Sequence, residues 1–172
     1  MTRVYLGLGS NIEPERNLAL GVAELERRFG KLELSPVYRA PAVGFESPDF
    51  LNAVAAIETA LAPEALLEII EEIHDVAGRE RDATNKWVAR SLDIDLLLYG
   101  DLVSPERPLR VPRGDVLDYA FVLRPLAELA PGDVHPVTGR TFAEHWAEFD
   151  ASAEPLTPVD IDLEGAAASR QN

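Results

Sequence analysis

The spacing of apolar and polar residues divides the first hundred residues into strands and helices. Four short apolar runs, each bounded by glycine, proline or polar residues, predict strands at residues 4–9, 32–39, 51–59 and 92–99. Between them, apolar residues at helical spacing predict two helices, a first that Gly30 ends and a second from Pro63 to Gly78. Ser10 and Glu13 form the pattern of a capping box at the start of the first helix.

This order of elements predicts the class of fold. The order β-α-β-β-α-β is that of a ferredoxin-like α+β sandwich, which has a mainly antiparallel sheet with helices packed on one face. Pro36 lies inside the second strand and indicates an edge or a bulge there. A functional site on such a fold is expected on the other face of the sheet and in its loops.

The region after residue 100 has weaker patterns. Residues 100–140 predict extra loops and short helices. Thr141 and Glu144 then predict a capped last helix, with Phe142 and Trp146 on its apolar face.

Length and composition favour one globular domain followed by a tail. At 172 residues and 47% hydrophobic content, the chain is long enough for a single core, which we place at residues 1–146. From residue 147 onward the sequence is acidic, rich in small residues and interrupted by proline. This composition predicts a flexible, solvated tail over residues 147–172.

The sequence predicts a soluble, cytoplasmic monomer. The chain has no cysteine, which excludes disulfides and thiolate metal sites and fits a reducing compartment. Its first apolar stretch, residues 4–8, is too short for the core of a signal peptide. No stretch of the sequence approaches the ~20 apolar residues of a membrane helix, so a membrane is not an expected partner.

The charge is unevenly distributed. A net charge of −14 argues against nucleic acid as a partner, because most of the surface would repel a phosphate backbone. Residues 79–113, however, carry seven basic and six acidic side chains, a local charge of +1 that leaves −15 for the rest. An arginine-rich segment in an acidic chain favours a compact polyphosphate bound with a divalent metal. Each arginine taken alone is equally compatible with an ordinary surface ion pair.

Two carboxylates interrupt the apolar strand at residues 92–99. Asp93 and Asp95 are two positions apart, so in a strand their side chains point to the same face. Like charges at neighbouring positions repel, and aspartate is uncommon in strands. The pair therefore predicts a bound cation, and the nearby arginines indicate that this cation carries phosphate.

Other candidate motifs are weak. Gly7 and Gly9 lie at the end of a predicted strand, much as in a dinucleotide-binding loop, but the third glycine position is Ile12, and the sequence contains no P-loop lysine motif. Three histidines lack metal-ligand spacing and are expected at the surface or in packing: His74, His135 and His145.

Several groups of residues, in unbroken order between about residues 2 and 142, carry a family resemblance. They are Leu8-Gly9-Ser10-Asn11, Tyr38-Arg39-Ala40-Pro41 with Gly44, Pro48-Asp49-Phe50-Leu51-Asn52, Gly78-Arg79-Glu80-Arg81, Trp87 with Arg90-Ser91-Leu92-Asp93-Ile94-Asp95, and Phe121-Val122-Leu123-Arg124-Pro125-Leu126. With these residues the chain resembles the 6-hydroxymethyl-7,8-dihydropterin pyrophosphokinases of folate biosynthesis. The fold of that family is the ferredoxin-like sandwich that the order of elements predicts.

The resemblance implies a magnesium-dependent transfer of the β,γ-pyrophosphoryl group of ATP to the hydroxymethyl group of a reduced pterin, with release of AMP. Asp93 and Asp95 would hold two Mg²⁺ ions that bridge the phosphates. Arg79 and Arg90 would join them as catalytic residues by clamping the phosphates and stabilising charge. The nucleotide site that the resemblance implies consists of Arg79, Arg81, Trp87, Arg90, Leu96, Arg110 and Arg113.

For the flat, aromatic pterin, the resemblance implies a stacking pair, an amide and a stretch of backbone. Phe50 and Phe121 match the stacking pair, and Asn52 matches the amide that binds the pterin edge. For Phe121, a role in the core is an equally good interpretation. Trp87 resembles a tryptophan on a mobile loop that closes over the site. Backbone groups would supply the remaining contacts around Ala40, Pro41, Val43 and Gly44.

Some positions depart from the family pattern, all on the nucleotide side: Glu71, His74, Val88, Ala89, Arg113 and Tyr119. They change the expected ATP contacts and leave the carboxylates and the pterin residues intact. One alternative is therefore a divergent paralogue that acts as a pterin-binding or regulatory module with weak or no turnover. Another is a different metal-dependent phosphoryl or nucleotidyl transferase on the same fold.

Overall fold

The computed structural model describes residues 1–44, 46–82 and 91–164, with the backbone alone for residues 79–82. Among these residues, no helix has the combined length and hydropathy that crossing a membrane requires. The described elements, in chain order, are β1 (Thr2–Ser10), α1 (Pro14–Phe29), β2 (Glu33–Leu34), β3 (Val37–Ala40), β4 (Phe50–Thr59), α2 (Pro63–Asp82), β5 (Asp93–Tyr99), α3 (Asp115–Asp118), α4 (Ala120–Leu129), α5 (Phe142–Glu148) and β6 (Thr157–Val159).

The strands form one antiparallel sheet in the order β5-β1-β4-β3-β6, and β2 also pairs with β4. β1 pairs with β4 on one side, from Thr2 opposite Thr59 to Ser10 opposite Leu51, and with β5 on the other side. Three of the expected strands are present as β1, β4 and β5. The predicted α+β class with a mainly antiparallel sheet is confirmed.

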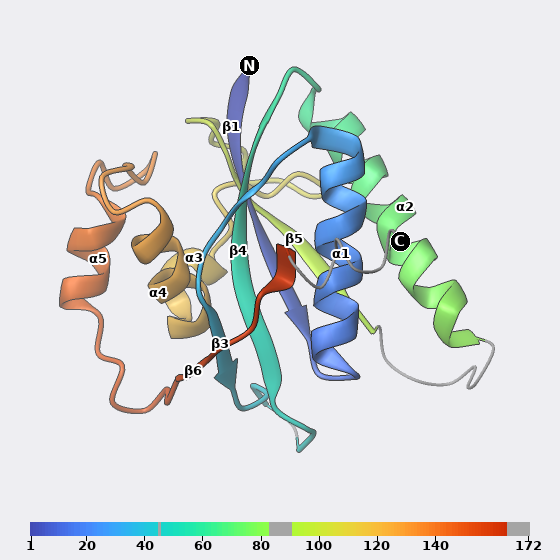
Figure 1. Cartoon of the computed structure of the whole chain (residues 1–172). Helices are drawn as coiled ribbons and strands as arrows, with labels where there is room; N and C mark the ends of the chain where they lie inside the picture. The colour runs from blue at the N-terminus through green and yellow to red at the C-terminus, as the bar shows by residue number, and fades with distance from the viewer. Residues whose placement is uncertain (45, 83–90, 165–172) are drawn as a thin grey trace.

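Alternate residues of β1 enter two different cores. Val4, Leu6 and Leu8 belong to a buried cluster with α1 and α2, the two helices on one face of the sheet in Figure 1. Tyr5 points to the other face and belongs to a second cluster with α4 and α5. The sheet is therefore buried on both sides over part of its length.

The second core corrects the expectation that helices cover one face alone. In Figure 1, α3, α4 and α5 lie across the sheet from α1 and α2. Leu126 of α4 and Phe142 of α5 are buried, at 0% and 1% exposure. The region after residue 100 thus forms a second helical layer, and it leaves a hollow between the sheet and the starts of α3 and α4.

The start of α1 differs from the expected capping box. The helix begins at Pro14, and Glu13 before it has a left-handed backbone (φ 39°) without a side-chain capping bond. The Ser10 hydroxyl instead donates to the carbonyl oxygen of Ser91 at 2.5 Å and ties β1 to the residue before β5. The local pattern was wrong here because the helix begins only at Pro14, and the Ser10 hydroxyl accepts from the N–H of Ile12 at 3.3 Å instead of from a helix N–H.

Glycine ends α1 as expected but does not end α2. Gly30 follows α1 with a φ of 81°, a conformation that favours glycine. Gly78 has no such positive φ, and α2 continues through it to Asp82. The expected end of the second helix at Gly78 is therefore wrong.

The expected strand at residues 32–39 is interrupted where Pro36 lies. β2 and β3 both pair with β4, and Ser35 and Pro36 separate them. Ser35 keeps this stretch attached to the sheet: its N–H donates to the Val54 carbonyl oxygen at 2.9 Å, and its hydroxyl accepts from the Val54 N–H at 2.8 Å. The irregularity that Pro36 predicts is confirmed.

The segment after residue 147 is partly ordered against the sheet. Thr157–Val159 forms β6, which pairs with β3. Leu163 is 3% exposed and belongs to the core shared with α1 and α2. A solvated tail is therefore wrong for this part of the segment, whereas the domain boundary at residue 146 stays a prediction.

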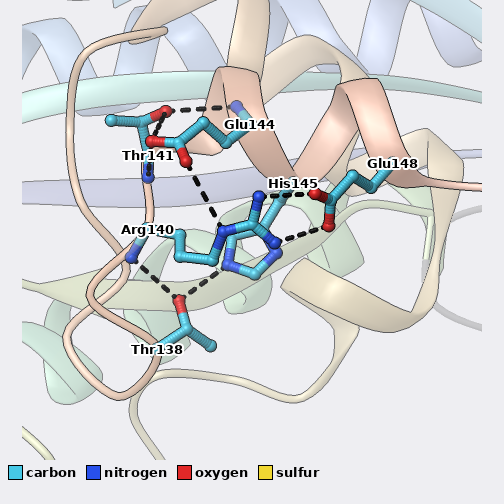
Figure 2. A network of polar contacts seen from close by, with 6 residues as sticks. All are labelled: Thr138, Arg140, Thr141, Glu144, His145 and Glu148. Atoms are coloured by element: carbon cyan, nitrogen blue, oxygen red, sulfur yellow. Dashed lines mark hydrogen bonds and ion pairs between the residues drawn. The ribbon is translucent and has the colours of Figure 1, made fainter.

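The last helix is capped as predicted. The Thr141 hydroxyl accepts from the Glu144 N–H at 3.1 Å, and the Glu144 carboxylate accepts from the Thr141 N–H at 3.3 Å (Figure 2). Arg140 extends this network along α5 through ion pairs with Glu144 and Glu148. The network fixes the start of α5 at the surface of the molecule.

Candidate active site

Gly7 and Gly9 of β1 form a strip without side chains on the face of the sheet opposite α1 and α2. Gly9 pairs with Asn52 of β4 on one side and with Asp93 of β5 on the other. Gly7 pairs with Asp95 in the same way. Residues that pair directly across antiparallel strands point to the same face. The amide of Asn52 and both carboxylates therefore border one bare strip, which we call the glycine strip.

A cavity of about 230 Å³ lies over the glycine strip. It is bounded by β1, β4 and β5, by the residues that follow β3, and by the starts of α3 and α4. The sequence-predicted site residues that line this cavity are Pro41, Val43, Phe50, Asn52, Asp93, Asp95 and Phe121.

Asp93 and Asp95 are suited to a hard divalent cation. Both are partly exposed, and both line the cavity from the same face of β5. Among the residues with described side chains, no group of three or more His, Cys, Asp or Glu side chains forms a metal site. Two carboxylates alone suit Mg²⁺, which keeps several waters or phosphate oxygens in its coordination shell.

The environment of Asp95 disfavours an isolated negative charge. Burial raises the pKa of Asp95 above its ordinary value, and the neighbouring Asp93 and Asp115 carboxylates raise it further. The Arg113 guanidinium opposes this shift. A cation bound in the cavity would therefore stabilise the ionised form of the carboxylate pair.

Arg113 and Asp115 join the carboxylate pair. Arg113 Nη1 lies 3.8 Å from Asp95 Oδ1, and Arg113 Nε donates to Asp115 Oδ2 at 3.1 Å. Asp115 also lines the cavity, although the sequence analysis did not select it. In the sequence, Asp115 stands out only as an aspartate two residues after Arg113 in a turn-forming stretch. Such a position is too common to predict a functional site.

The opposite side of the cavity offers an unpaired amide. Asn52 is 8% exposed, and its Nδ2 has no hydrogen-bond partner in the part of the chain that the structure describes. A buried donor without a partner costs free energy unless a ligand pairs with it. Phe50 lies beside Asn52 in β4, and both line the cavity.

Phe121 lies at the start of α4 and combines a packing role with a cavity surface. Its side chain packs against the core of α4 and α5 and also lines the cavity. The core role and the pterin-stacking role considered from the sequence are therefore both compatible with its position. Its ring stacks on Tyr119, with centroids 5.1 Å apart and an interplanar angle of 17°. Tyr119 stands where the resemblance leads us to expect an arginine.

Other predicted site residues are placed differently. Ala40 pairs with Phe50 at the end of β3, and Gly44 has a φ of 84°, but neither lines the cavity. Leu96 belongs to the core on the opposite face of β5, and Arg110 is exposed outside the cavity lining. Several predicted residues lie outside the described residues or have undescribed side chains: Arg79, Arg81, Trp87, Val88, Ala89 and Arg90.

His74 supports the strand that carries the carboxylates, a role that the sequence analysis missed. Its Nε2 accepts from the backbone N–H of Ile94 at 2.9 Å, and Ile94 lies between the two aspartates. Because Nε2 accepts, the proton is on Nδ1, which lies 3.0 Å from Glu71 Oε1. Both departures on α2, Glu71 and His74, therefore contribute to the position of β5.

Comparison with known proteins assigns the chain to a family. A family model for 7,8-dihydro-6-hydroxymethylpterin-pyrophosphokinase matches residues 5–131. A 2-amino-4-hydroxy-6-hydroxymethyldihydropteridine pyrophosphokinase of Methylorubrum extorquens is 43% identical over 157 residues, 88% of this chain and 96% of the relative. A protein of the same name from Pseudomonas aeruginosa is 39% identical over 146 residues, 83% of this chain and 88% of the relative.

These matches place the chain among the pyrophosphokinases and confirm the resemblance. It belongs to the 7,8-dihydro-6-hydroxymethylpterin-pyrophosphokinase family, whose members transfer pyrophosphate from ATP to a hydroxymethyldihydropterin in folate synthesis.

Solved structures support the same fold. The chain is similar to the crystal structure of Plasmodium falciparum HPPK-DHPS wild type, with a TM-score of 0.66 at 15% identity, over 86% of this chain and 44% of that one. It is also similar to an HPPK-DHPS in complex with substrates, with a TM-score of 0.69 at 11% identity, over 88% and 46%. The chain spans less than half the length of these two proteins, and the likeness confirms the ferredoxin-like fold.

Proposed function

We propose that this chain transfers the β,γ-pyrophosphoryl group of ATP to the hydroxymethyl oxygen of 6-hydroxymethyl-7,8-dihydropterin and releases AMP. One observation carries the proposal: an unpaired amide donor and two carboxylates border the same cavity, on opposite sides of the glycine strip. The amide suits the edge of a polar heterocycle, and the carboxylates suit a metal bound to phosphate. A reaction between these two substrates needs both in one cavity.

The pterin binds on the β4 side of the cavity. Its ring packs against Phe50 and Phe121, because aromatic faces stack favourably. Asn52 Nδ2 donates to an acceptor on the pterin edge, which pairs the buried donor. Backbone groups near Pro41 and Val43, which line the same side, supply further contacts.

The nucleotide binds on the β5 side, where Asp93 and Asp95 would hold Mg²⁺. A metal held there would neutralise phosphate charge and lower the pKa of the attacking hydroxyl group. The Arg113 guanidinium borders this site and offers a fixed cation to the phosphates or to the leaving AMP. Because the chemistry is attack of an alcohol on a polyanion, charge neutralisation and alignment supply most of the catalysis.

Further residues complete the nucleotide site in this proposal. By the family resemblance, Arg79, Arg81 and Arg90 would bind the phosphates and Trp87 would belong to the nucleotide site; Trp87 and Arg90 lie outside the described residues, and only the backbone of Arg79 and Arg81 is described. Leu96 contributes backbone groups, since its side chain lies in the core. Arg110 is exposed and provides a peripheral charge for the nucleotide.

The decisive assay uses the full chain with ATP, Mg²⁺ and the reduced hydroxymethylpterin, and it follows the nucleotide product. AMP that forms only when the pterin is present supports the proposal. ADP or free pyrophosphate as the product supports a different phosphoryl or nucleotidyl transferase. Tight pterin binding without turnover supports a pterin-binding module.

A matched pair of substitutions tests the carboxylates. Asp95→Asn should lower turnover by on the order of 10²- to 10³-fold, as loss of one preorganised electrostatic group does in other enzymes. Asp101→Asn changes an exposed aspartate just beyond β5 and should leave turnover unchanged. Circular dichroism and thermal melting check that both variants are folded. Normal turnover in a folded Asp95→Asn variant contradicts the metal assignment.

A further inference from the structure

Gly9 has no backbone reason to be glycine. It lies inside β1, and it does not belong to the described glycines with positive φ. Glycine in the interior of a strand lowers stability, because it orders a flexible residue and packs no side chain. A close neighbour is the other physical reason for glycine at such a position.

The close neighbour is the side chain of Asn52. A Cβ atom on Gly9 would lie 3.2 Å from Asn52 Oδ1 and 4.0 Å from Phe50 Cδ1. The first distance is tighter than a Cβ atom normally keeps from a neighbouring atom, so the amide would have to shift by a few tenths of an ångström. Asn52 is almost completely buried, so its amide has little space into which to move.

The Asn52 amide has no internal bond that holds its donor in place. Nδ2 lacks a hydrogen-bond partner among the described residues. Packing against neighbouring atoms therefore contributes most to the direction in which Nδ2 points. Gly9 pairs directly with Asn52 in the sheet, and the missing side chain of Gly9 gives this amide its space.

Gly7 is a matched control in the same strand. Both glycines line the cavity from one face of β1, two positions apart. A Cβ atom on Gly7 would lie 3.4 Å from Leu97 Cδ2, an ordinary contact with an apolar side chain. Alanine at Gly7 therefore reports the general effect of alanine in this strand without a contact to Asn52.

We infer that Gly9 is a positioning residue for pterin recognition, acting through Asn52 by setting the orientation of the amide beside the cavity. The inference rests on the proposed function, since it takes the pterin as the ligand of Asn52. The three atoms nearest to a Cβ on Gly9 all belong to β4, and none belongs to Asp93. Nucleotide binding should therefore be spared.

The first test compares Gly9→Ala with Gly7→Ala by isothermal titration with the reduced hydroxymethylpterin and, separately, with Mg²⁺ and ATP. Gly9→Ala should raise the pterin Kd about 10-fold, the upper range for loss of one hydrogen bond, and change the ATP Kd by less than about 2-fold. Gly7→Ala also adds a methyl group to the floor of the cavity but has no contact with Asn52, so any loss of pterin affinity should be smaller than in Gly9→Ala and no larger than its loss of ATP affinity. Equal pterin defects in the two variants, or an ATP defect as large as the pterin defect in Gly9→Ala, overturn the inference.

The second test asks whether the effect passes through Asn52. In an Asn52→Ala background, Gly9→Ala should add little to the pterin defect, because residues that act through one contact are not additive. A full additional loss of about 10-fold overturns the inference. If Gly9→Ala alone does not fold, circular dichroism and melting of the Gly9→Ala, Asn52→Ala double variant test the contact instead. Restored folding in the double variant supports the contact with Asn52. Continued failure to fold overturns the inference. Failure of the proposed function is distinguishable, because it appears as wild-type protein that forms no pterin-dependent AMP.

Discussion

Arg113 Nη1 lies 3.8 Å from Asp95 Oδ1, so a fixed cation borders the carboxylate that we propose as a metal ligand. Its Nε also donates to Asp115, which holds the guanidinium at this edge of the cavity. A cation at this distance favours the ionised form of Asp95, and it also repels a second cation. Arg113 should therefore oppose metal binding as long as no nucleotide is present.

Replacement of Arg113 by glutamine should strengthen metal binding in the absence of ATP. We expect the Kd for Mn²⁺, used in place of Mg²⁺, to fall about 5-fold, which corresponds to the ~1 kcal/mol between unit charges at 4 Å in water. Titration followed by electron paramagnetic resonance measures this Kd. Arg110→Gln removes an exposed arginine outside the cavity lining and should leave it unchanged. An unchanged Kd in Arg113→Gln would contradict the repulsion between Arg113 and the metal ion.

The sequence predicted those parts of the site that depend on local geometry. Asp93 and Asp95 share a face because strand side chains alternate, which needs no knowledge of the rest of the chain. The contact between Arg113 and Asp95 has a different origin. The chain must return from the end of β5 to place Arg113 beside the strand, and no spacing rule encodes that return.

The fold shows the same division between local and distant causes. The capping box of Thr141 and Glu144 formed because its two members have each other as partners. The same pattern at Ser10 was wrong because the helix begins only at Pro14, and the Ser10 hydroxyl accepts from the Ile12 N–H and donates to the distant carbonyl oxygen of Ser91. β6 was missed because three residues at a sheet edge have no period to detect, and pairing with β3 defines them as a strand.

His74 should contribute to stability through the strand that carries the carboxylates. His74→Ala removes the acceptor of the Ile94 N–H and leaves that group without its partner inside the structure. We expect the free energy of unfolding to fall by ~1–2 kcal/mol, measured by urea denaturation. His145→Ala is a matched control, because the side chain of His145 bonds a threonine hydroxyl at an exposed position (Figure 2). Equal losses in the two variants would argue against a special role for His74.

His135 makes stability depend on pH. Burial lowers the pKa of His135 below its ordinary value of 6.5, and the nearby His145 lowers it further. Its Nδ1 accepts from the N–H groups of Val137 at 3.2 Å and Thr138 at 3.3 Å, and protonation of Nδ1 would break both bonds. Because the pKa is lower in the folded state, the unfolded state binds more protons as the pH falls below about 6.5. The contribution of neutral His135 is complete above that pH and is lost below it.

Urea denaturation at several values from about pH 5 to 8 measures this contribution. The wild-type protein should lose stability below about pH 6.5 more steeply than His135→Gln, whose amide has no proton to gain in this range. His145→Gln should keep most of the wild-type slope, because burial is the larger cause of the shift at His135. Parallel curves for wild type and His135→Gln would reject this source of pH dependence.

Leu163 tests whether the C-terminal segment belongs to the folded core. Its side chain is 3% exposed and lies in the cluster shared with α1 and α2, so Leu163→Ala should leave a cavity there. We expect the free energy of unfolding in urea to fall by ~2 kcal/mol or more, as for other buried leucines. Thr157→Ala changes an exposed residue of β6 and should cost less than ~0.5 kcal/mol. A loss in Leu163→Ala no larger than in this control would mean that the segment is solvated, because only a packed side chain leaves a cavity when it is truncated.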